Sequence, residues 1–474
     1  MDEGPNEKNW TITMNLHDDK QRNIQMRLDF SKQRTGEACA GKREETESSG
    51  ARRGSESPAR TPRLMEEICE WNNLKEALHR VRANKGSPGI DGMTVEQLPD
   101  YPQLVPIRVR LLNGTYEPQA VRRVEIPKPD GGVRKLGIPT VLDRFVQHAV
   151  MQVLEKQWEP TFSDSSYGFR PGRSTHQAVA RAQEYIGAGY GWVVDLDLEK
   201  FFDRVNHDRL MAAIAERVED KRVLRLIRAF LNAGVMEDGL RSPTVEGTPQ
   251  GGPLSPLLSN IVLDELDREL EARKLRFVRY ADDCNIYVRT ERAGQRVMES
   301  VKRFITTRLK LKVNEAKSAV ARPSQRKFLG FSFSAGPVVL RRIAPKALER
   351  FKDRVREITG WAKGMSLTRM LATLAPYLRG WRGYFGYCET PTVLQDLDGW
   401  VRRRLRSAQW RQWKTSRRRR AALIQLGVGS PLAASTAGSN RGPWYLACTK
   451  ALCFALPNAY FRSLGLPSLA AVSR

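Results

Sequence analysis

The chain has few cysteines and histidines for its length, and it has no long apolar run. Its 474 residues include six cysteines and five histidines, and the cysteines lack C-x-x-C spacing. Their scatter supports neither a zinc knuckle nor a disulfide framework. No apolar stretch reaches the roughly 20 residues of a membrane span, and the polar first ten residues do not resemble a secretory signal. These absences favour a reducing cytoplasm and exclude a membrane partner.

Acidic residues are also scarce relative to basic ones. The chain has 79 lysines and arginines against 53 aspartates and glutamates, a formal net charge of +26 at pH 7. Such an excess indicates a polyanionic partner. Nucleic acid is favoured over a membrane surface because no basic amphipathic anchor stands out. A merely solvated basic surface explains so large an excess poorly.

Composition and periodicity divide the chain into four segments. Residues 1–62 are polar and poor in aromatics, so we expect a disordered extension. Strand-like and helical patterns alternate over 63–335, which predicts an α+β domain. Helical spacing over 341–415 predicts a helical domain. The remainder, 416–474, is expected to be a basic linker, flexible at 427–442, and a short apolar tail.

An acidic tetrapeptide, Tyr280–Asp283, lies between two runs rich in β-branched and aromatic residues, 275–280 and 285–288. Flanks of this kind favour strands, and the tetrapeptide then forms the tip of a tight hairpin. Two adjacent carboxylates repel each other unless a cation or a proton relieves them. An acidic hairpin tip held in solvent is the simpler alternative for this tetrapeptide alone.

A third carboxylate, Asp197, ends another strand-like run, 192–198. If that strand lies beside the hairpin, Asp197 joins Asp282 and Asp283. Oxygen ligands without a histidine or cysteine pair suit Mg²⁺ rather than zinc. Three such carboxylates can hold two Mg²⁺ ions for phosphoryl transfer. Other nearby aspartates are interpreted as helix caps or surface residues: Asp195, Asp203 and Asp208.

These motifs occur in an order that resembles a known family. Asp197–Asp203 reads DLEKFFD, Thr248–Pro256 reads TPQGGPLSP and Tyr280–Asp283 reads YADD. Together they resemble the palm of a reverse transcriptase, and more narrowly the bacterial group II intron reverse transcriptase/maturase family. The resemblance extends over about 63–415. Further blocks agree in order: Asn84–Gly92, Ile126–Pro139, Ser166–Arg173, Leu311–Ser318 and Phe328–Phe331.

The resemblance implies a right-hand polymerase, with fingers and palm over 63–335 and a helical thumb, or maturase (X) domain, over 341–415. Asp197, Asp282 and Asp283 would be the catalytic, metal-binding residues, with two Mg²⁺ ions as cofactors. A bulky Phe202 beneath the nucleotide sugar would exclude a 2′-hydroxyl, while Phe201 beside it would pack in the core. The implied nucleotide-binding residues are Lys128, Arg134, Phe202, Gln250 and Lys317, and the implied primer-positioning residues are Gly330 and Phe331.

The resemblance and the basic charge together predict a nucleic-acid surface. The window Trp400–Arg420 carries ten lysines and arginines and no acid, which would give salt-dependent affinity for RNA and DNA. We expect Trp381 and Phe385 to be core residues. The expected nucleic-acid-binding residues are Arg170, Arg173, Arg379, Arg382, Arg402, Arg403, Arg404, Arg406, Arg417, Arg418, Arg419 and Arg420.

The activity implied is an RNA-directed DNA polymerase encoded by a group II intron, which also assists splicing and copies the intron during retrohoming. Its partners would be the parent intron RNA, an RNA template with a DNA primer, deoxynucleotides and target DNA, in the bacterial cytoplasm at the nucleoid. Cysteine pairs and histidines of a nuclease module are missing after Arg420, so the chain resembles the endonuclease-lacking, class C branch, with a DNA-binding-like tail over 416–474. Alternatives are a splicing-only maturase, a domesticated cellular reverse transcriptase, and an RNA-dependent RNA polymerase, which Phe202 disfavours.

Overall fold

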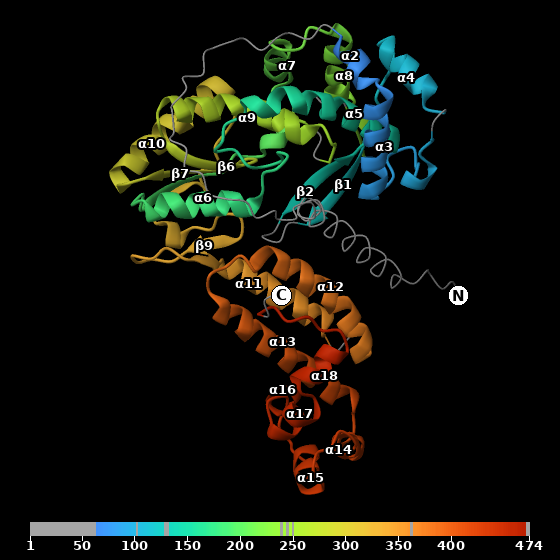
Figure 1. The fold of residues 1–474 in the computed structure, drawn as a ribbon, viewed down its shortest axis with the longest axis vertical. Coiled ribbons are helices and arrows are strands. Elements are labelled where there is room, and N and C mark those ends of the chain that lie inside the picture. The colour runs from blue at the N-terminus through green and yellow to red at the C-terminus, as the bar shows by residue number, and fades with distance from the viewer. Residues whose placement is uncertain are drawn as a thin grey trace, which may run out of the picture. The chain divides into compact units, whose positions relative to one another are not determined.

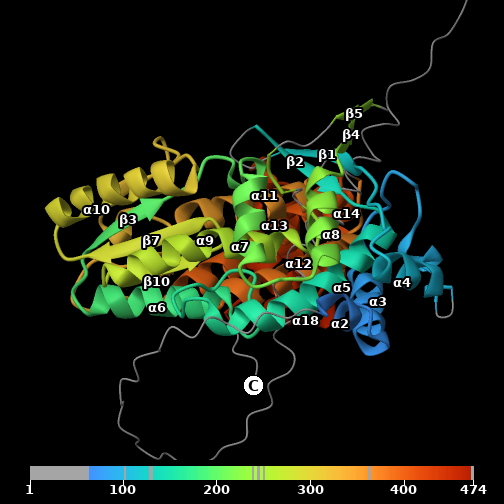
Figure 2. The same ribbon diagram turned by 90° about the horizontal axis from the view of Figure 1, so that it is seen from above.

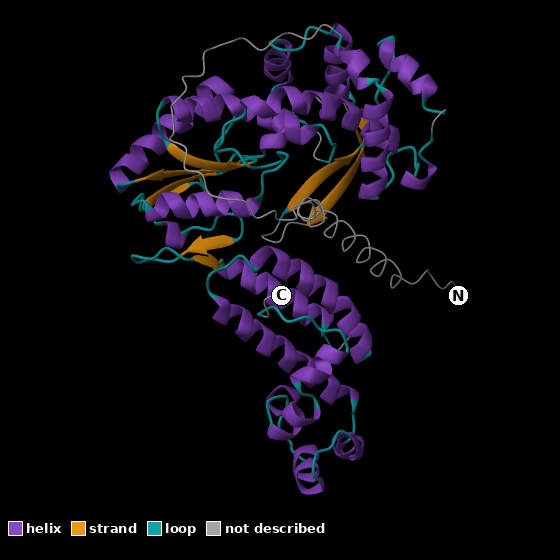
Figure 3. Ribbon diagram, in the orientation of Figure 1, coloured by secondary structure: helices purple, strands orange, loops and turns teal. Residues whose placement is uncertain are grey.

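The computed structural model describes residues 63–100, 103–127, 132–237, 240–242, 246–248, 251–360 and 364–470. The expected disordered extension, 1–62, lies outside these ranges. The chain divides into two compact units, one ending at Ala321 and the other beginning at Arg322. The first unit mixes helices with two sheets, and the second is mainly helical (Figure 3). The α+β fold class with a following helical region is therefore confirmed.

A four-stranded antiparallel sheet in the first unit carries the acidic motifs. Its strand order is β6-β7-β3-β8. Helices α6, α9 and α10 pack against it (Figure 1). Its strands are β3 (Trp192–Leu196), β6 (Arg276–Tyr280), β7 (Asp283–Val288) and β8 (Ala319–Ala321).

A second sheet of this unit contains an antiparallel hairpin that includes most of the Ile126–Pro139 block. Strands β1 (Val121–Pro127) and β2 (Val133–Ile138) pair antiparallel, with Ile126 opposite Arg134. Strand β4 (Val235–Glu237) then runs parallel to β1 and pairs with β5 (Leu240–Ser242). Figure 2 shows this ribbon beside the hairpin.

Apolar faces of the helices form one continuous core in the first unit. Residues of α5 such as Phe145 and Val150 are buried against it, as are Leu263 and Leu270 of α9. The helices of this unit are α2 (Leu64–Ile68), α3 (Trp71–Asn84), α4 (Val105–Leu112), α5 (Val141–Trp158), α6 (Thr175–Gly187), α7 (His207–Ala215), α8 (Lys221–Asn232), α9 (Ser255–Ala272) and α10 (Glu291–Phe304), with short 3₁₀ or π turns at Val95–Gln97, Glu159–Thr161, Phe201–Asp203 and Ile305–Leu309.

The second unit begins with a 3₁₀ turn and a two-stranded ribbon and continues as helices around a separate core. Its helices α12 and α13 lie within the span 341–415, for which helical spacing predicted a helical domain. The elements are the turn Pro323–Gln325, β9 (Phe331–Phe333), β10 (Arg341–Ile343), α11 (Pro345–Ile358), α12 (Leu367–Phe385), α13 (Pro391–Gln412), α14 (Ser416–Gln425), α15 (Ser430–Ala437), α16 (Pro443–Leu446), α17 (Lys450–Ala455) and α18 (Asn458–Ser463).

The expectation of a flexible linker at 427–442 is wrong. Helix α15 occupies most of that segment, and Val428, Ala433 and Ala437 are buried in the second core. Small apolar residues between glycines therefore pack as a helix here, because neighbouring helices cover them. No helix in the described ranges is long and apolar enough to cross a membrane.

Candidate active site

Antiparallel pairing of β3 with β7 brings the separated aspartates together. Leu196, the last residue of β3, lies opposite Cys284 in β7. One residue further, Asp197 leaves β3 at the end where Asp283 begins β7, and Asp282 occupies the adjoining turn. The strand register therefore places all three carboxylates at one end of the sheet, as the sequence predicted.

The carboxylate of Asp282 shows the electrostatic strain of this arrangement. Burial raises its pKa because an ionised carboxylate loses solvation, and the negative charge of Asp197 raises it further. A backbone hydrogen bond and the positive charges of Arg134 and Arg279 act in the opposite direction. Additional positive charge at this point would therefore stabilise the ionised form.

Carboxylate oxygens from Asp197, Asp282 and Asp283 are the kind of donor that Mg²⁺ takes. No three histidine, cysteine or acidic side chains in the described part of the chain are already gathered into a metal-binding cluster. The fit to a divalent ion rests instead on the donor chemistry and on the raised pKa of Asp282, since a cation would relieve the repulsion.

The turn that carries Asp282 is only two residues long. Tyr280 pairs with Asp283 across the hairpin, so Ala281 and Asp282 form the tip. Ala281 has a φ of 55°, in the left-handed region that is unfavourable for residues with a Cβ. Gly168 lies against this tip, where an added Cβ would come within 2.3 Å of the Ala281 backbone nitrogen. The Ser166–Arg173 block thus supports the acidic hairpin directly.

The segment that follows Leu311 closes the site beside Asp197. Asn314 donates its backbone N–H to the Asp197 carbonyl at 2.8 Å. The Asp197 N–H donates to Ser318 Oγ at 3.0 Å. Lys317 Nζ lies 3.7 Å from Asp197 Oδ2 and is exposed. Ser318 was missed in the sequence, although it directly follows the lysine that was chosen.

Phe201 packs in the core as expected, and Phe202 lies in a different environment. Phe201 is 2% exposed in the core, whereas Phe202 is only partly buried at the edge of that core. The carbonyl of Phe202 accepts the Thr248 N–H at 2.7 Å. This contact joins the start of the TPQGGPLSP loop to Phe202, but Gln250 itself lies outside the described residues.

A buried histidine anchors the same loop and was not found from the sequence. His207 Nε2 lies 2.6 Å from the Gly247 carbonyl, and Nδ1 lies 3.2 Å from Asn232 Oδ1. The only sequence signal was its position just after the DLEKFFD block. His207 therefore links the start of the loop to Asn232 in α8.

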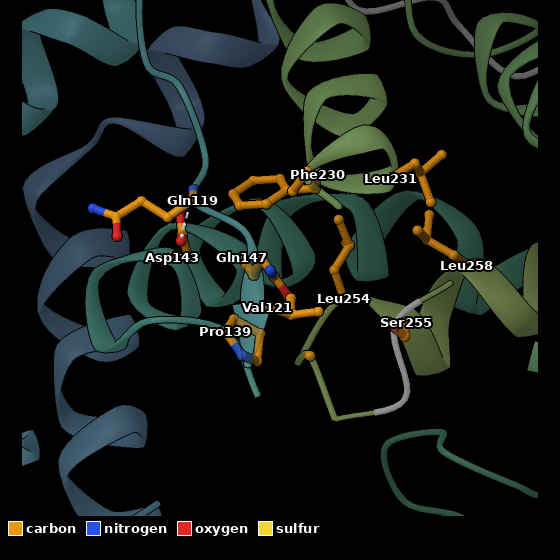
Figure 4. Close-up of a pocket in the computed structure, with 12 residues that line it drawn as sticks. Gln119, Val121, Pro139, Asp143, Gln147, Phe230, Leu231, Leu254, Ser255 and Leu258 are labelled. Carbon is orange, nitrogen blue, oxygen red and sulfur yellow. Dashed lines mark hydrogen bonds between the residues drawn. The ribbon is translucent and has the colours of Figure 1, made fainter. Parts of the chain in front are cut away.

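Behind the far end of the loop lies a small pocket between β1, α5, α8 and the start of α9 (Figure 4). Gly252 borders it, and a Cβ there would come within 2.5 Å of Gln147 Oε1. Asp143 on its wall accepts hydrogen bonds from Thr140, Tyr116 and the Gln119 N–H. The loop therefore packs closely against α5 at Gly252.

The fingers hairpin contributes Arg134, which is exposed on β2. Its charge acts at Asp282, so this arginine and the acidic turn are close enough to interact. Lys128, the other expected triphosphate ligand, falls outside the described residues.

The structure corrects the expectation for Arg170 as a nucleic-acid ligand. Arg170 is 4% exposed and pairs with Glu159 at 2.9 Å. It also donates to the carbonyls of Ser163 and Ser166. Its guanidinium is already occupied, so it stabilises the loop. Arg173 is partly exposed and pairs with Asp164.

The arginines of the second unit divide into occupied and exposed groups. Arg406 is 9% exposed and donates to the Leu456 carbonyl, so its expected role is corrected to a structural one. Arg403 stacks on Trp444 at 4.1 Å, and Arg404 donates to Thr359. The partly buried remainder are Arg382, Arg402 and Arg419, and the exposed ones are Arg379, Arg417, Arg418 and Arg420.

The two residues expected to position the primer, Gly330 and Phe331, differ in their exposure. Phe331 is fully buried, and its ring packs 5.7 Å from Tyr384 and 5.5 Å from Phe385. The Phe331 ring therefore holds the loop instead of touching a primer. Gly330, at φ 81°, stays partly exposed. Trp381 is buried and Phe385 packs against the core, as expected.

Residues 126–333 match the model of the reverse transcriptase (RNA-dependent DNA polymerase) family. Residues 348–424 match the maturase-specific domain of group II introns. The chain therefore contains a reverse transcriptase domain followed by a group II intron maturase domain, and it is a homologue of group II intron-encoded proteins.

Two bacterial relatives illustrate the likeness. Protein YkfC of Escherichia coli is 42% identical over 224 residues, which cover 46% of this chain and 59% of that protein. The group II intron-encoded protein LtrA of Lactococcus lactis is 35% identical over 287 residues, covering 47% of this chain and 48% of LtrA. The chain thus spans less than two thirds of either relative.

Among solved structures, a chain of a partial Cas6-RT-Cas1–Cas2 complex is 26% identical, covering 52% of this chain and 42% of that chain, with a TM-score of 0.34. A score this low adds nothing to the assignment.

Proposed function

We propose that the chain is an RNA-directed DNA polymerase encoded by a group II intron, which also binds the intron RNA to assist splicing and copies it during retrohoming. The observation that carries this proposal is the pairing of β3 with β7, which puts Asp197 at the end of the sheet where Asp282 and Asp283 lie, inside the reverse transcriptase domain. A splicing-only maturase would not need three aspartates at this end of the sheet. Their presence favours polymerisation.

In the proposed reaction, the 3′-hydroxyl of a DNA primer attacks the α-phosphorus of a deoxynucleoside triphosphate. A new P–O bond forms, the bond from the α-phosphorus to the bridging oxygen breaks, and pyrophosphate leaves while the hydroxyl loses its proton. Two Mg²⁺ ions held by the three aspartates would supply charge neutralisation at the attacking and leaving oxygens.

Basic side chains around the carboxylates would bind the triphosphate. Arg134 is exposed and its charge acts at Asp282, and a guanidinium suits phosphate oxygens. Lys317 lies beside Asp197 and would offset charge that develops during transfer. Lys128 and Gln250 remain predicted nucleotide-binding residues. Phe202 would select deoxynucleotides.

The helical unit would supply RNA and DNA affinity. Exposed arginines on α12 and α14 can contact phosphates independently of sequence. Preferential binding to the active fold of the intron RNA would raise the population of that fold, while the RNA performs the splicing chemistry. Target DNA would be met at the bacterial nucleoid.

The test is primer extension on an RNA template with Mg²⁺, using the full-length protein and its Asp282→Asn variant. The variant should lose synthesis by on the order of 100- to 1,000-fold or more, because a ligand charge is removed. Binding of intron RNA should stay nearly unchanged. Asp208→Asn is the control, since Asp208 is an exposed carboxylate paired with Arg228 and should retain synthesis. Equal loss of synthesis and RNA binding in Asp282→Asn would contradict the proposal.

A further inference from the structure

A fully buried ion pair lies directly behind the acidic hairpin. The side chains of Arg279, in β6, and Asp267, in α9, have no exposed surface. Arg279 Nε donates to Asp267 Oδ1 at 2.7 Å, and Nη2 donates to Oδ2 at 2.5 Å. Burying two charges is costly, and an apolar pair of similar volume often stabilises a core as well. The pair is therefore poorly explained by stability alone.

The remaining guanidinium donors of Arg279 reach three different segments. Nη1 donates to Asn260 Oδ1 and to the Ala281 carbonyl, each at 3.0 Å. Nη2 donates to Ser166 Oγ at 2.7 Å. An arginine has five N–H donors in a fixed fork, and all of them are used here. One of them ends on the peptide carbonyl that immediately precedes Asp282.

The same polar cluster holds the surface against which the turn rests. Asn260 accepts from Arg279 and donates its Nδ2 to the Gly168 carbonyl at 2.9 Å. Gly168 in turn abuts the backbone of Ala281. The backbone N–H of Arg279 donates to the Ser165 carbonyl, and its carbonyl accepts the Tyr167 N–H. Helix α9, the 165–168 loop and β6 are thus joined at one guanidinium.

Ala281 needs such support because of its backbone conformation. Its φ of 55° lies in the left-handed region, where a residue with a Cβ is strained and persists only when its surroundings fix it. The hydrogen bond from Arg279 to the Ala281 carbonyl fixes the peptide plane on one side. Contact with Gly168 fixes it on the other.

We propose that Arg279, held by Asp267, Asn260 and Ser166, is a positioning residue that fixes the Ala281–Asp282 turn and so sets the place of the Asp282 carboxylate beside Asp197. This inference deepens the proposed polymerase function and rests on it. Lysine cannot replace Arg279, because an ammonium has three donors on a point charge and cannot span the fork of acceptors.

The matched control is a second arginine of the same unit. Arg222 donates to both carboxylate oxygens of Asp220, to Glu66 and to the Leu112 carbonyl, so its Nε and both Nη atoms are engaged, with 26% of the side chain exposed. Its partners are Glu66 in α2, Leu112 in α4 and Asp220 at the start of α8, and none of them belongs to the acidic hairpin. Arg222→Lys therefore removes a comparable network without touching the turn.

Steady-state primer extension with a Mg²⁺ titration tests the proposal in the full-length protein. Arg279→Lys and the milder Ser166→Ala should each lower kcat per folded molecule, Arg279→Lys by about 10-fold or more, and should raise the Mg²⁺ concentration for half-maximal rate. The KM for the primer–template should not change. Arg222→Lys should keep both kcat and the Mg²⁺ dependence. Wild-type kcat and Mg²⁺ dependence in both Arg279→Lys and Ser166→Ala would overturn the positioning role.

Hydrogen–deuterium exchange provides a readout that does not depend on activity. Amides in the peptide spanning 276–288 should exchange faster in Arg279→Lys and Ser166→Ala than in the wild type, and at the wild-type rate in Arg222→Lys. If the wild type makes no DNA, the polymerase proposal fails, yet this exchange still decides the inference. Wild-type exchange rates in both Arg279→Lys and Ser166→Ala would overturn the inference.

Discussion

Single residues around the acidic turn have roles that their neighbours in sequence do not share. Phe201 is part of the core, whereas Phe202 is only partly buried and its carbonyl is tied to Thr248. Gly168 and Arg279 meet the same two-residue turn from different sides. At each of these positions, a single contact accounts for the type of residue that is present.

At this scale, Phe202→Ala should admit ribonucleotides. Removing the ring would relieve its clash with a 2′-hydroxyl, so the ratio of kcat/KM for ribonucleotides over deoxynucleotides should rise by roughly 10-fold or more. Single-nucleotide primer extension measures that ratio.

Phe201→Leu provides the control, because Phe201 is a core residue and the change should affect stability more than selectivity. A ratio in Phe202→Ala equal to that of the wild type would remove the sugar-sensing role.

Elements were predicted from the sequence where their local pattern was strong. Strand-like runs predicted β3, β6 and β7, and helical spacing predicted the helical region that contains α11 to α13. The meeting of Asp197 with the turn followed because both motifs end strands. These features depend on short-range patterns that can be read directly from the sequence.

Features that depend on tertiary partners were missed. The bond between Arg279 and Asp267 joins a strand to a helix, and nothing in the local sequence marks either residue as buried. Arg170 and Arg406 were assigned to nucleic acid from the family resemblance and the local basic charge, although both are buried. Helix α15 was taken for a linker because its cover comes from other helices.

The packing of an element against the turn yields a second prediction. Gly168→Ala would place a Cβ 2.3 Å from the Ala281 nitrogen, so the hairpin must shift. We expect DNA synthesis to fall at least tenfold and the first unit to lose about 1–3 kcal/mol of unfolding free energy. Primer extension and denaturant unfolding measure the two effects.

The control for this change is Gly187→Ala. Gly187 is the last residue of α6, with nothing within 4 Å of an added Cβ, and alanine favours a helix over glycine. This variant should keep full synthesis. If Gly168→Ala behaved in the same way, the hairpin would not depend on that contact.

The net charge of +26 belongs to the whole molecule, and exposed arginines lie on several helices. Arg417, Arg418 and Arg420 are exposed on one short helix, α14. Several expected basic contacts elsewhere are instead engaged in stacking or hydrogen bonds within the protein. Affinity for nucleic acid should therefore depend on where the exposed arginines lie as well as on the total charge.

Replacing Arg417, Arg418 and Arg420 together with glutamine should weaken RNA binding across sequences. Each lost phosphate contact should also reduce the salt slope of log K by roughly 0.7–0.9. Filter binding or fluorescence anisotropy at several salt concentrations measures both quantities.

The charge-matched comparison replaces three exposed arginines of α10, namely Arg292, Arg296 and Arg303. If both triple variants lose the same affinity and slope, diffuse charge explains binding and α14 has no special part.

The pairing of Leu196 with Cys284 has a consequence for how this gene can change in length. Side chains alternate between the two faces of a sheet, so one inserted or deleted codon within β3 or β7 would send Asp197 or Asp283 to the opposite face. Insertions between elements would leave that alignment intact. Homologues that keep the three aspartates should therefore vary in length at their loops and keep these two short stretches free of frame-preserving insertions and deletions.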